Sequence, residues 1–172
     1  MLSLSDNEFS VLSFLVRNFT ERLTIRNIAQ RLGFSAAGVF NILKKLEKEG
    51  IVVGQRLGTG LFYSINFENR IAEHLAAVVL LYPQEKTELD VGKLKQAKAV
   101  IFDRKSLLVI MDNISVLDVS IPNIEVISKT EDEVISLLRK KDTQLTQLLS
   151  NGTVLFGEDV IVDIIKKCIS WF

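Results

Sequence analysis

The sequence predicts a chain of the α+β or α/β class, in which a small domain of helices and one β-hairpin is followed by a small mixed α/β domain. Three observations favour this prediction. Apolar residues recur at helical spacing through residues 6–49, two β-branched and aromatic runs then flank a pair of glycines, and short apolar runs alternate with helical patterns after residue 96. We therefore expect domains at residues 1–66 and 91–172, connected by a helix and a linker over residues 67–90.

The first predicted helix begins at a capping box. Ser5 and Glu8 have the spacing at which two side chains satisfy each other's backbone N–H groups. Apolar residues then recur at helical intervals, at Phe9, Leu12, Leu15, Val16 and Phe19. A helix over about Asp6–Asn18 is expected.

Two further helices, joined by a tight turn, are predicted between Thr24 and Gly50. Thr24 and Ser35 stand where N-caps are needed, and Gly33 and Gly50 stand where the helices should end. The apolar residues of each helix share one face: Ile25, Ile28, Ala29 and Leu32 in the first, and Val39, Ile42, Leu43 and Leu46 in the second. Two amphipathic helices in this order form a helix-turn-helix.

A β-hairpin is predicted directly after the second of these helices. Ile51–Val53 and Leu61–Ile65 are rich in β-branched and aromatic residues, and Gly58-Thr59-Gly60 marks the turn between them. This glycine run is too short for a phosphate-binding loop, so it fits a turn better. Arg56 is expected close to the tip of the hairpin.

The connecting segment is predicted to contain a helix capped by Asn66. Its apolar face is wide, with Ile71, Leu75, Val78, Val79 and Leu81 supplemented by Ala72, Ala76 and Ala77. This face is buried either against the second domain or in a dimer interface, and the sequence favours neither. Pro83 ends the helix, and the polar run Gln84–Glu88 is the expected linker.

The C-terminal part alternates between short apolar runs and capped helices. Buried strands are expected at Ala97–Phe102, Leu107–Met111, Ile124–Ser128 and Thr153–Phe156. Helices are expected to start at the caps Thr130 and Asp142, and a closing helix carries Val160, Ile161, Ile164 and Ile165.

Charge and cysteine content exclude several classes of protein. The chain has a net charge of zero, which argues against a general nucleic-acid coat protein. Between Arg22 and Arg56, however, seven bases face two acids, whereas from Ile71 onward twelve bases face fifteen acids. A basic field over the helix-turn-helix favours a surface that faces DNA. The single cysteine, Cys168, excludes an internal disulfide framework and a cysteine-based zinc cluster, and is expected in the core of the last helix.

The first residues and the hydropathy predict a cytoplasmic protein. Met1–Asp6 has neither the basic region nor the long apolar region of a signal peptide. The most apolar run, Leu75–Tyr82, is too short to span a bilayer, so we expect no membrane association.

A turn with serine, Phe34-Ser35, leads into a helix that ends as Leu43-Lys44-Lys45-Leu46-Glu47-Lys48-Glu49-Gly50-Ile51-Val52. With the hairpin that follows, this segment resembles the winged helix-turn-helix domain of MarR- or ArsR-type transcription regulators. The resemblance implies that the helix over residues 35–49 enters the major groove of duplex DNA and that the hairpin, the wing, reaches the minor groove. It also implies a short strand at Leu23–Thr24, before the first helix of the helix-turn-helix.

The same resemblance implies which side chains contact DNA. It places Val39, Leu43 and Leu46 inward, and the candidate contacts are Arg26, Ser35, Ala37, Phe40, Asn41, Lys44, Lys45 and Arg56. Asn41 would read a base, because an asparagine amide bonds adenine through two hydrogen bonds. Ser35, at the helix start, and the basic residues Arg26, Lys44 and Lys45 would hold phosphates, while Arg56 would be the minor-groove probe of the wing.

Two features of this surface leave alternatives open. Ala36, Ala37, Gly38 and Phe40 stand where DNA-reading helices more often carry polar residues, so Phe40 would touch either a thymine methyl group or another protein. The basic residues Arg26, Arg31, Lys44 and Lys48 would alternatively form only a solvated face.

The run Leu149–Asp159, in which a helix leads into Gly-Thr-Val-Leu-Phe-Gly, carries a second resemblance. It is similar to the C-terminal part of small nucleotidyltransferase-fold domains, over roughly Leu94–Lys167. Active members carry Gly-Ser after the first strand and a metal-holding Asp-x-Asp on the second. This chain has Asp103-Arg104 and Ser106–Val109 at those places, so the resemblance implies a catalytically inactive copy.

The sequence thus predicts a non-enzymatic, DNA-binding transcription regulator that acts as a homodimer on double-stranded DNA, with no cofactor and no metal site. The second domain would serve assembly or the sensing of a small-molecule or protein effector. Two alternatives remain: a nucleotidyltransferase that depends on Asp112, and a winged-helix module that binds protein through Phe40. Asp103, Asp112 and Asp118 are interpreted as solvated turn residues rather than metal ligands.

Overall fold

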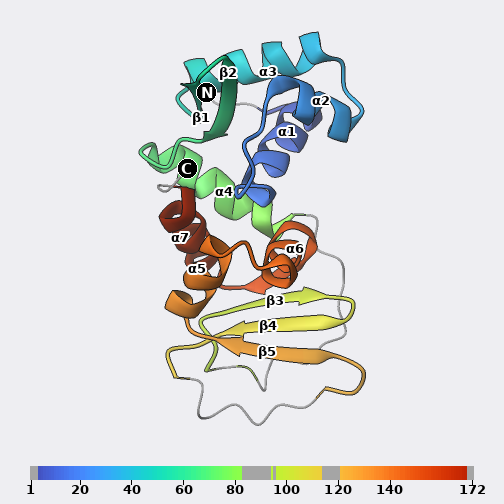
Figure 1. Cartoon of the computed structure of the whole chain (residues 1–172), viewed down its shortest axis with the longest axis vertical. Helices are drawn as coiled ribbons and strands as arrows, with labels where there is room; N and C mark the ends of the chain where they lie inside the picture. Colours follow the sequence, from blue (N-terminus) through green and yellow to red (C-terminus); the bar gives the residue numbers. More distant parts are fainter. Residues whose placement is uncertain (1–3, 83–93, 95, 114–120, 170–172) are drawn as a thin grey trace. The chain divides into compact units, whose positions relative to one another are not determined.

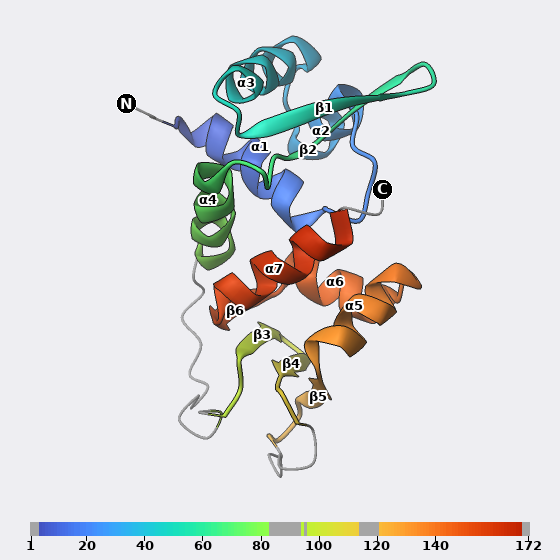
Figure 2. The ribbon, with the colours of Figure 1, turned by 90° about the vertical axis from the view of Figure 1, so that its left-hand side faces the viewer.

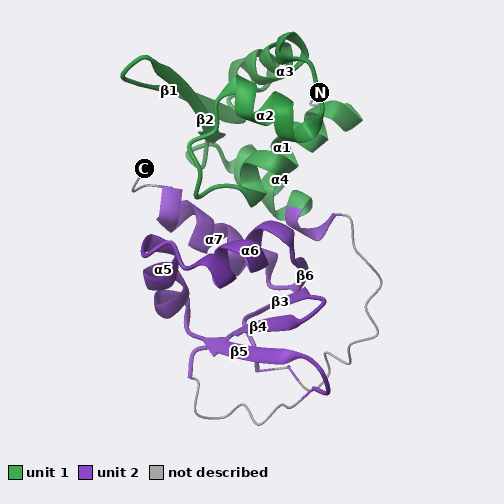
Figure 3. Ribbon diagram, turned by 45° about the vertical axis from the view of Figure 1, so that its right-hand side comes forward, with its two compact units in different colours: residues 1–79, 172 green, residues 80–171 purple. Residues whose placement is uncertain are grey.

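The structure is a computed structural model that describes residues 4–82, 94, 96–113 and 121–169. Its elements are shown along the chain in Figure 1. The chain divides into two compact units, residues 1–79 and residues 80–171 (Figure 3). The division falls near the end of α4 (Arg70–Leu81).

The first unit contains the three helices that the sequence predicts. They are α1 (Asp6–Arg17), α2 (Ile25–Leu32) and α3 (Ala36–Lys48). Each begins at its predicted cap, because the Ser5, Thr24 and Ser35 hydroxyls each accept a backbone N–H three residues later. Their core is made of aliphatic side chains that are at most 2% exposed: Val11, Leu12, Leu15, Val16, Ile28, Val39, Leu43 and Leu46. The helix-turn-helix is therefore confirmed.

The wing is longer than predicted. Its strands β1 (Val52–Leu57) and β2 (Gly60–Ile65) pair antiparallel around a two-residue turn, Gly58-Thr59 (Figure 2). The exposed polar pair Gln55 and Arg56 hid the second half of β1 from a search for apolar runs. Of the two turn residues only Gly58 has a positive φ, 59°, which a two-residue hairpin of the II′ type requires at its first position. The predicted short strand at Leu23 is present as a bridge to Tyr63.

The cap of α4 differs from the prediction. Asn69, and not Asn66, caps the helix, because its Oδ1 accepts the N–H of Ile71 at 2.9 Å. Asn66 instead accepts the N–H of Glu68 in a local turn. Both asparagine amides donate to the carbonyl oxygen of Gly50, at 2.9 Å and 3.0 Å, so this pair fastens the start of α4 to the end of the helix-turn-helix.

In its described residues the second unit is a mixed four-stranded sheet with three helices. Its strands are β3 (Ala99–Asp103), β4 (Ser106–Ile110), β5 (Glu125–Lys129) and β6 (Thr153–Phe156), and its helices are α5 (Glu131–Arg139), α6 (Thr143–Asn151) and α7 (Glu158–Ile169). The strand order is β5-β4-β3-β6, in which only β4 and β5 are parallel. Every predicted strand and helix of this part is present.

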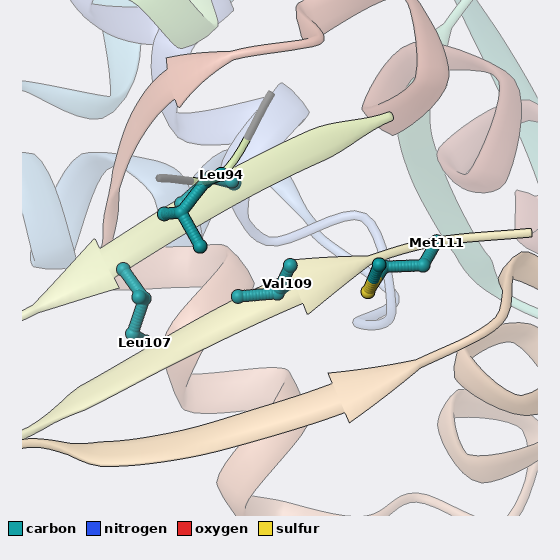
Figure 4. Close-up of a cluster of buried hydrophobic side chains, with 5 residues drawn as sticks. Leu94, Leu107, Val109 and Met111 are labelled. Atoms are coloured by element: carbon teal, nitrogen blue, oxygen red, sulfur yellow. The ribbon is translucent and has the colours of Figure 1, made fainter. Parts of the chain in front are cut away.

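Both faces of this sheet are covered. The helices α5, α6 and α7 lie on one side (Figure 1), and the predicted core position of Cys168 on α7 is confirmed at 3% exposure. On the other side Leu107 and Val109 of β4 join Leu94 and Met111 in a separate apolar cluster (Figure 4). The near-continuous apolar pattern of β4 follows from this two-sided burial.

The carboxylates of the second unit behave as turn and surface residues where the structure describes them. Asp103 accepts the N–H of Arg104 at 2.6 Å in the two-residue turn between β3 and β4. Asp112 is exposed and pairs with Lys98, at 3.1 Å. The predicted positions of Asp118 and of the linker Gln84–Glu88 lie outside the described residues. The likeness to a nucleotidyltransferase stays a prediction.

Candidate nucleic-acid interface

The turn between α2 and α3 is built by local capping. Gly33, with a φ of 69°, ends α2 in the left-handed conformation that glycine adopts without strain. Two residues later the Ser35 hydroxyl oxygen accepts the N–H of Gly38 at 3.0 Å and starts α3. Ser35 therefore fixes the N-terminal end of α3, the helix that by the resemblance enters DNA. The side chain of Ser35 is exposed.

The two faces of α3 are sharply different. Val39, Leu43 and Leu46 are fully buried against the rest of the unit. The opposite face is exposed, with Ser35, Ala36, Ala37, Phe40, Asn41, Lys44, Lys45 and Lys48 accessible to solvent. The outward positions expected from the sequence are thus exposed, and a helix with this division can enter a groove without disturbing the core.

Among the candidate DNA contacts, Lys45 is the one whose side chain is already held by a carboxylate of another helix. Its Nζ lies 2.7 Å from a carboxylate oxygen of Glu8, a residue that is only 7% exposed. The other oxygen of Glu8 accepts the N–H of Ser5 in the capping box of α1. Hydrogen bonding to Lys45 lowers the pKa of Glu8, and the same bond raises the pKa of Lys45. Lys45 therefore ties α3 to the start of α1.

Lys44 has a looser partner. Its Nζ lies 2.8 Å from Glu47, one turn further along α3, and both side chains are substantially exposed. The hydrogen bond to Glu47 raises the pKa of Lys44. Because exposed ion pairs contribute at most about 1 kcal/mol, a phosphate can replace Glu47 as the partner of Lys44 at small cost.

A buried hydroxyl lies close to this pair. Tyr63 of β2 is 3% exposed, and its hydroxyl makes no hydrogen bond within the described part of the chain. Burial, followed by the negative charge of Glu47, raises the pKa of Tyr63. A Cβ atom on Gly54 would lie 2.9 Å from Glu47 and 3.1 Å from the Tyr63 ring, so Gly54 lets β1 pass close beneath α3.

On each of α2, α3 and the wing, one exposed cation has no ion pair among the described residues. They are Arg26 on α2, Lys48 at the end of α3 and Arg56 on the wing. Arg31, by contrast, is held by Glu21 and Asn18, both at 2.6 Å, and lies over the Phe14 ring. Arg31, one of the four basic residues of the alternative solvated face, therefore stabilises the fold of the first unit instead.

The ion pairs reduce the local charge surplus that the sequence shows. The seven bases between Arg22 and Arg56 face two acids within that range, and Glu8 and Glu21 join them in space through Lys45 and Arg31. Seven bases against four acids leave a surplus of three. The remaining positive charge comes mainly from the cations that have no ion pair in the described part of the chain.

Sequence reasoning missed two residues of this surface. Lys48 was counted only as charge, although it lies four residues after Lys44 and seven after Asn41, a helical spacing that could have placed it on the same face. Glu8 was recognised as a cap but not as the partner of Lys45, because no local pattern joins residues 37 positions apart.

The described ranges contain neither a cluster of metal-ligating side chains nor a membrane-spanning helix. No three His, Cys, Asp or Glu side chains in them gather closely enough to hold a metal ion. None of the helices described is both long enough and apolar enough to cross a membrane.

Comparison with known proteins finds a family match for the first unit alone. Residues 2–59 match the MarR family, and this range contains α1, α2, α3 and the wing as far as its turn. No curated protein gives a significant match to the chain. The helix-turn-helix and the first strand of the wing are thus similar to the MarR family, while the match does not extend into the second unit.

Proposed function

We propose that this protein is a transcription regulator that binds double-stranded DNA, with α3 in the major groove and the wing in the minor groove. The observation that carries the proposal is that α2, α3 and the wing each present an exposed cation with no ion pair among the described residues: Arg26, Lys48 and Arg56. The similarity of residues 2–59 to the MarR family supports the same function, because that family consists of DNA-binding regulators.

The exposed side chains divide between phosphates and bases. Asn41 lies on the exposed face of α3 and is proposed to bond an adenine. Lys44 exchanges Glu47 for a phosphate, and Ser35 contacts a phosphate at the helix start. Lys45 contributes less to affinity than Lys44, because leaving Glu8 would strand a nearly buried carboxylate.

The protein is proposed to act as a homodimer, since one winged helix covers only a short half-site. In such a dimer the two copies of α3 are separated by about 34 Å, one turn of B-DNA, or by a simple multiple of it. The second unit serves assembly or effector binding. Sedimentation of the full chain with a bound duplex, giving two chains per site, supports this arrangement, and one chain per site contradicts it.

A protein-binding module is the second candidate, favoured by one observation. Phe40, on the exposed face of α3, is 44% exposed, and large exposed apolar groups often mark protein interfaces. The cations Arg26, Lys48 and Arg56 favour DNA, because a neutral protein surface gives them no partner.

Fluorescence anisotropy of the full chain on a labelled duplex, over a series of salt concentrations, tests the proposal. We expect the affinity to fall with salt, and Arg26→Gln, Lys48→Gln and Arg56→Gln each to reduce the logarithmic salt slope by about 1. Lys140→Gln, at an exposed position in the second unit, is the control and should leave the slope unchanged. No affinity at low salt, or equal slopes for all variants, contradicts the proposal.

A further inference from the structure

Phe40 is an aromatic side chain that the fold leaves nearly half exposed. It is 44% exposed, although Val39 and Leu43 beside it are fully buried and complete the inner face of α3. A half-exposed phenyl ring keeps apolar surface in water, which is unfavourable unless a partner covers it. The exposure of Phe40 therefore points to a contact made outside this chain.

The neighbours of Phe40 on the helix surface are unusually small. Ala36 and Ala37 lie four and three residues before it, which on a helix places them beside it toward the N-terminal end. Both are exposed, and neither side chain extends past its Cβ atom. The start of α3 thus presents an apolar surface of one ring and two methyl groups, with Lys44 one turn further along.

The chemistry around this surface indicates its partner. Lys44 and Lys48 follow on the same helix, and Lys48 has no ion pair within the described residues. A polyanion fits these cations, and on the base edges of its major groove duplex DNA carries one apolar group, the C5 methyl of thymine. Asn41, next to Phe40, has the amide that bonds adenine, the base paired with thymine.

We propose that Phe40, with Ala36 and Ala37, contacts thymine methyl groups in the major groove, and that with Asn41 it makes α3 select A·T pairs. This inference rests on the proposed function and adds the base class that α3 reads. Because the contact is to a methyl group, it distinguishes thymine from uracil, which has the same hydrogen-bonding edge and lacks only that methyl.

The test begins with duplexes selected by the full-length protein from a random library. Each thymine of a selected site is replaced in turn by deoxyuridine, and the affinity is measured by anisotropy. We expect one or more positions at which loss of the methyl weakens binding roughly fourfold, the effect of about one buried methylene. Phe40→Ala should bind the thymine duplex more weakly and lose its preference for thymine at those positions.

The control is Val53→Ala, because Val53 on the wing is 45% exposed and so matches Phe40 in exposure but lies outside α3. It should keep the preference of the wild type for thymine. Equal binding of thymine and deoxyuridine duplexes at every position, or a preference that survives in Phe40→Ala, overturns the inference while leaving DNA binding intact. Absence of binding to any duplex at low salt overturns the proposed function itself and favours a protein partner for Phe40.

Discussion

Among single residues, Glu8 connects more of the first unit than any local pattern suggests. One carboxylate oxygen accepts the N–H of Ser5 in the capping box, and the other pairs with Lys45 on α3. A glutamine at this position can keep the cap but cannot form the ion pair, so the two roles can be separated by mutation.

We expect Glu8→Gln to lower the free energy of unfolding of the first unit by about 1–2 kcal/mol, because a hydrogen bond to a charged group is lost. Glu8→Ala should cost about 1 kcal/mol more, since the hydrogen bond from the Ser5 N–H to the side chain is lost as well. Hydrogen exchange of the α1 amides measures both changes. Equal protection in the wild type and Glu8→Gln would show that the ion pair with Lys45 adds no stability.

The same pair predicts a dependence on pH. The bond to Lys45 lowers the pKa of Glu8 in the folded state. A carboxylate with a lowered pKa stabilises the fold above its unfolded pKa, about 4.3, and this stability is lost as the pH falls through the folded pKa. The difference in unfolding free energy between the wild type and Glu8→Gln should therefore be largest near neutral pH and disappear in acid. A difference that persists at low pH would contradict this explanation.

The hydroxyl of Tyr63 offers a test with the opposite sign. It is buried without a hydrogen-bond partner in the described residues, and burial of an unpaired polar group is unfavourable. We expect Tyr63→Phe to raise the stability of the first unit by about 1 kcal/mol, measured by urea unfolding followed by circular dichroism. A loss of stability would mean that the hydroxyl has a partner, such as an ordered water molecule.

At the scale of elements, two glycines allow the effect of backbone strain to be distinguished from the effect of a steric clash. Gly33 and Gly157 have similar positive φ angles, 69° and 77°. A Cβ atom on Gly33 would meet nothing within 4 Å, whereas one on Gly157 would lie 2.2 Å from the carbonyl oxygen of Lys98. Strain is common to both positions, but only Gly157 lets the start of α7 approach β3.

We expect Gly33→Ala to cost about 1 kcal/mol, the strain of a left-handed residue, and to lower the melting temperature by several degrees. Gly157→Ala should cost at least about 3 kcal/mol, because the backbone of β3 must move. Thermal unfolding followed by circular dichroism compares the two variants. Similar losses in both would show that the space beside Gly157 is not limiting.

The elements themselves could be predicted because their signals are local. The capping box of Thr130 and the cap of Asp142 fixed the starts of α5 and α6 within the predicted positions. The start of α4 could not be predicted. Asn66 and Asn69 offer the same side chain, and both donate to the carbonyl oxygen of Gly50. Only the backbone that follows decides that Asn69 accepts the N–H of Ile71 and caps α4.

The exposed face of the candidate site could be predicted from the sequence, whereas the ion pairs of its basic residues could not. Helical spacing places Asn41 and Lys44 on the outer face of α3, which the structure has. The partners that distinguish Lys45 and Arg31 from free cations, Glu8 and Glu21, come from other elements, so no spacing rule reaches them.

At the scale of the whole molecule, the two units carry different kinds of information. The first is similar to a known family over residues 2–59 and bears Arg26, Lys48 and Arg56 on its helix-turn-helix and wing. The second is built on a four-stranded sheet with an apolar cluster on one face, and its Lys98 pairs with Asp112 and Glu131. The proposed function therefore locates DNA binding in the first unit.

Mapping of amide chemical shifts in the full chain, with and without a duplex at low salt, tests this claim most directly. The account predicts shifts at residues 35–48 of α3 and residues 55–60 of the wing, with α1 amides near Glu8 little affected. The strands β3, β4 and β5 should keep their positions in the spectrum. Shifts confined to the second unit, or none at all, would contradict the assignment of α3 and the wing as the surface that binds DNA.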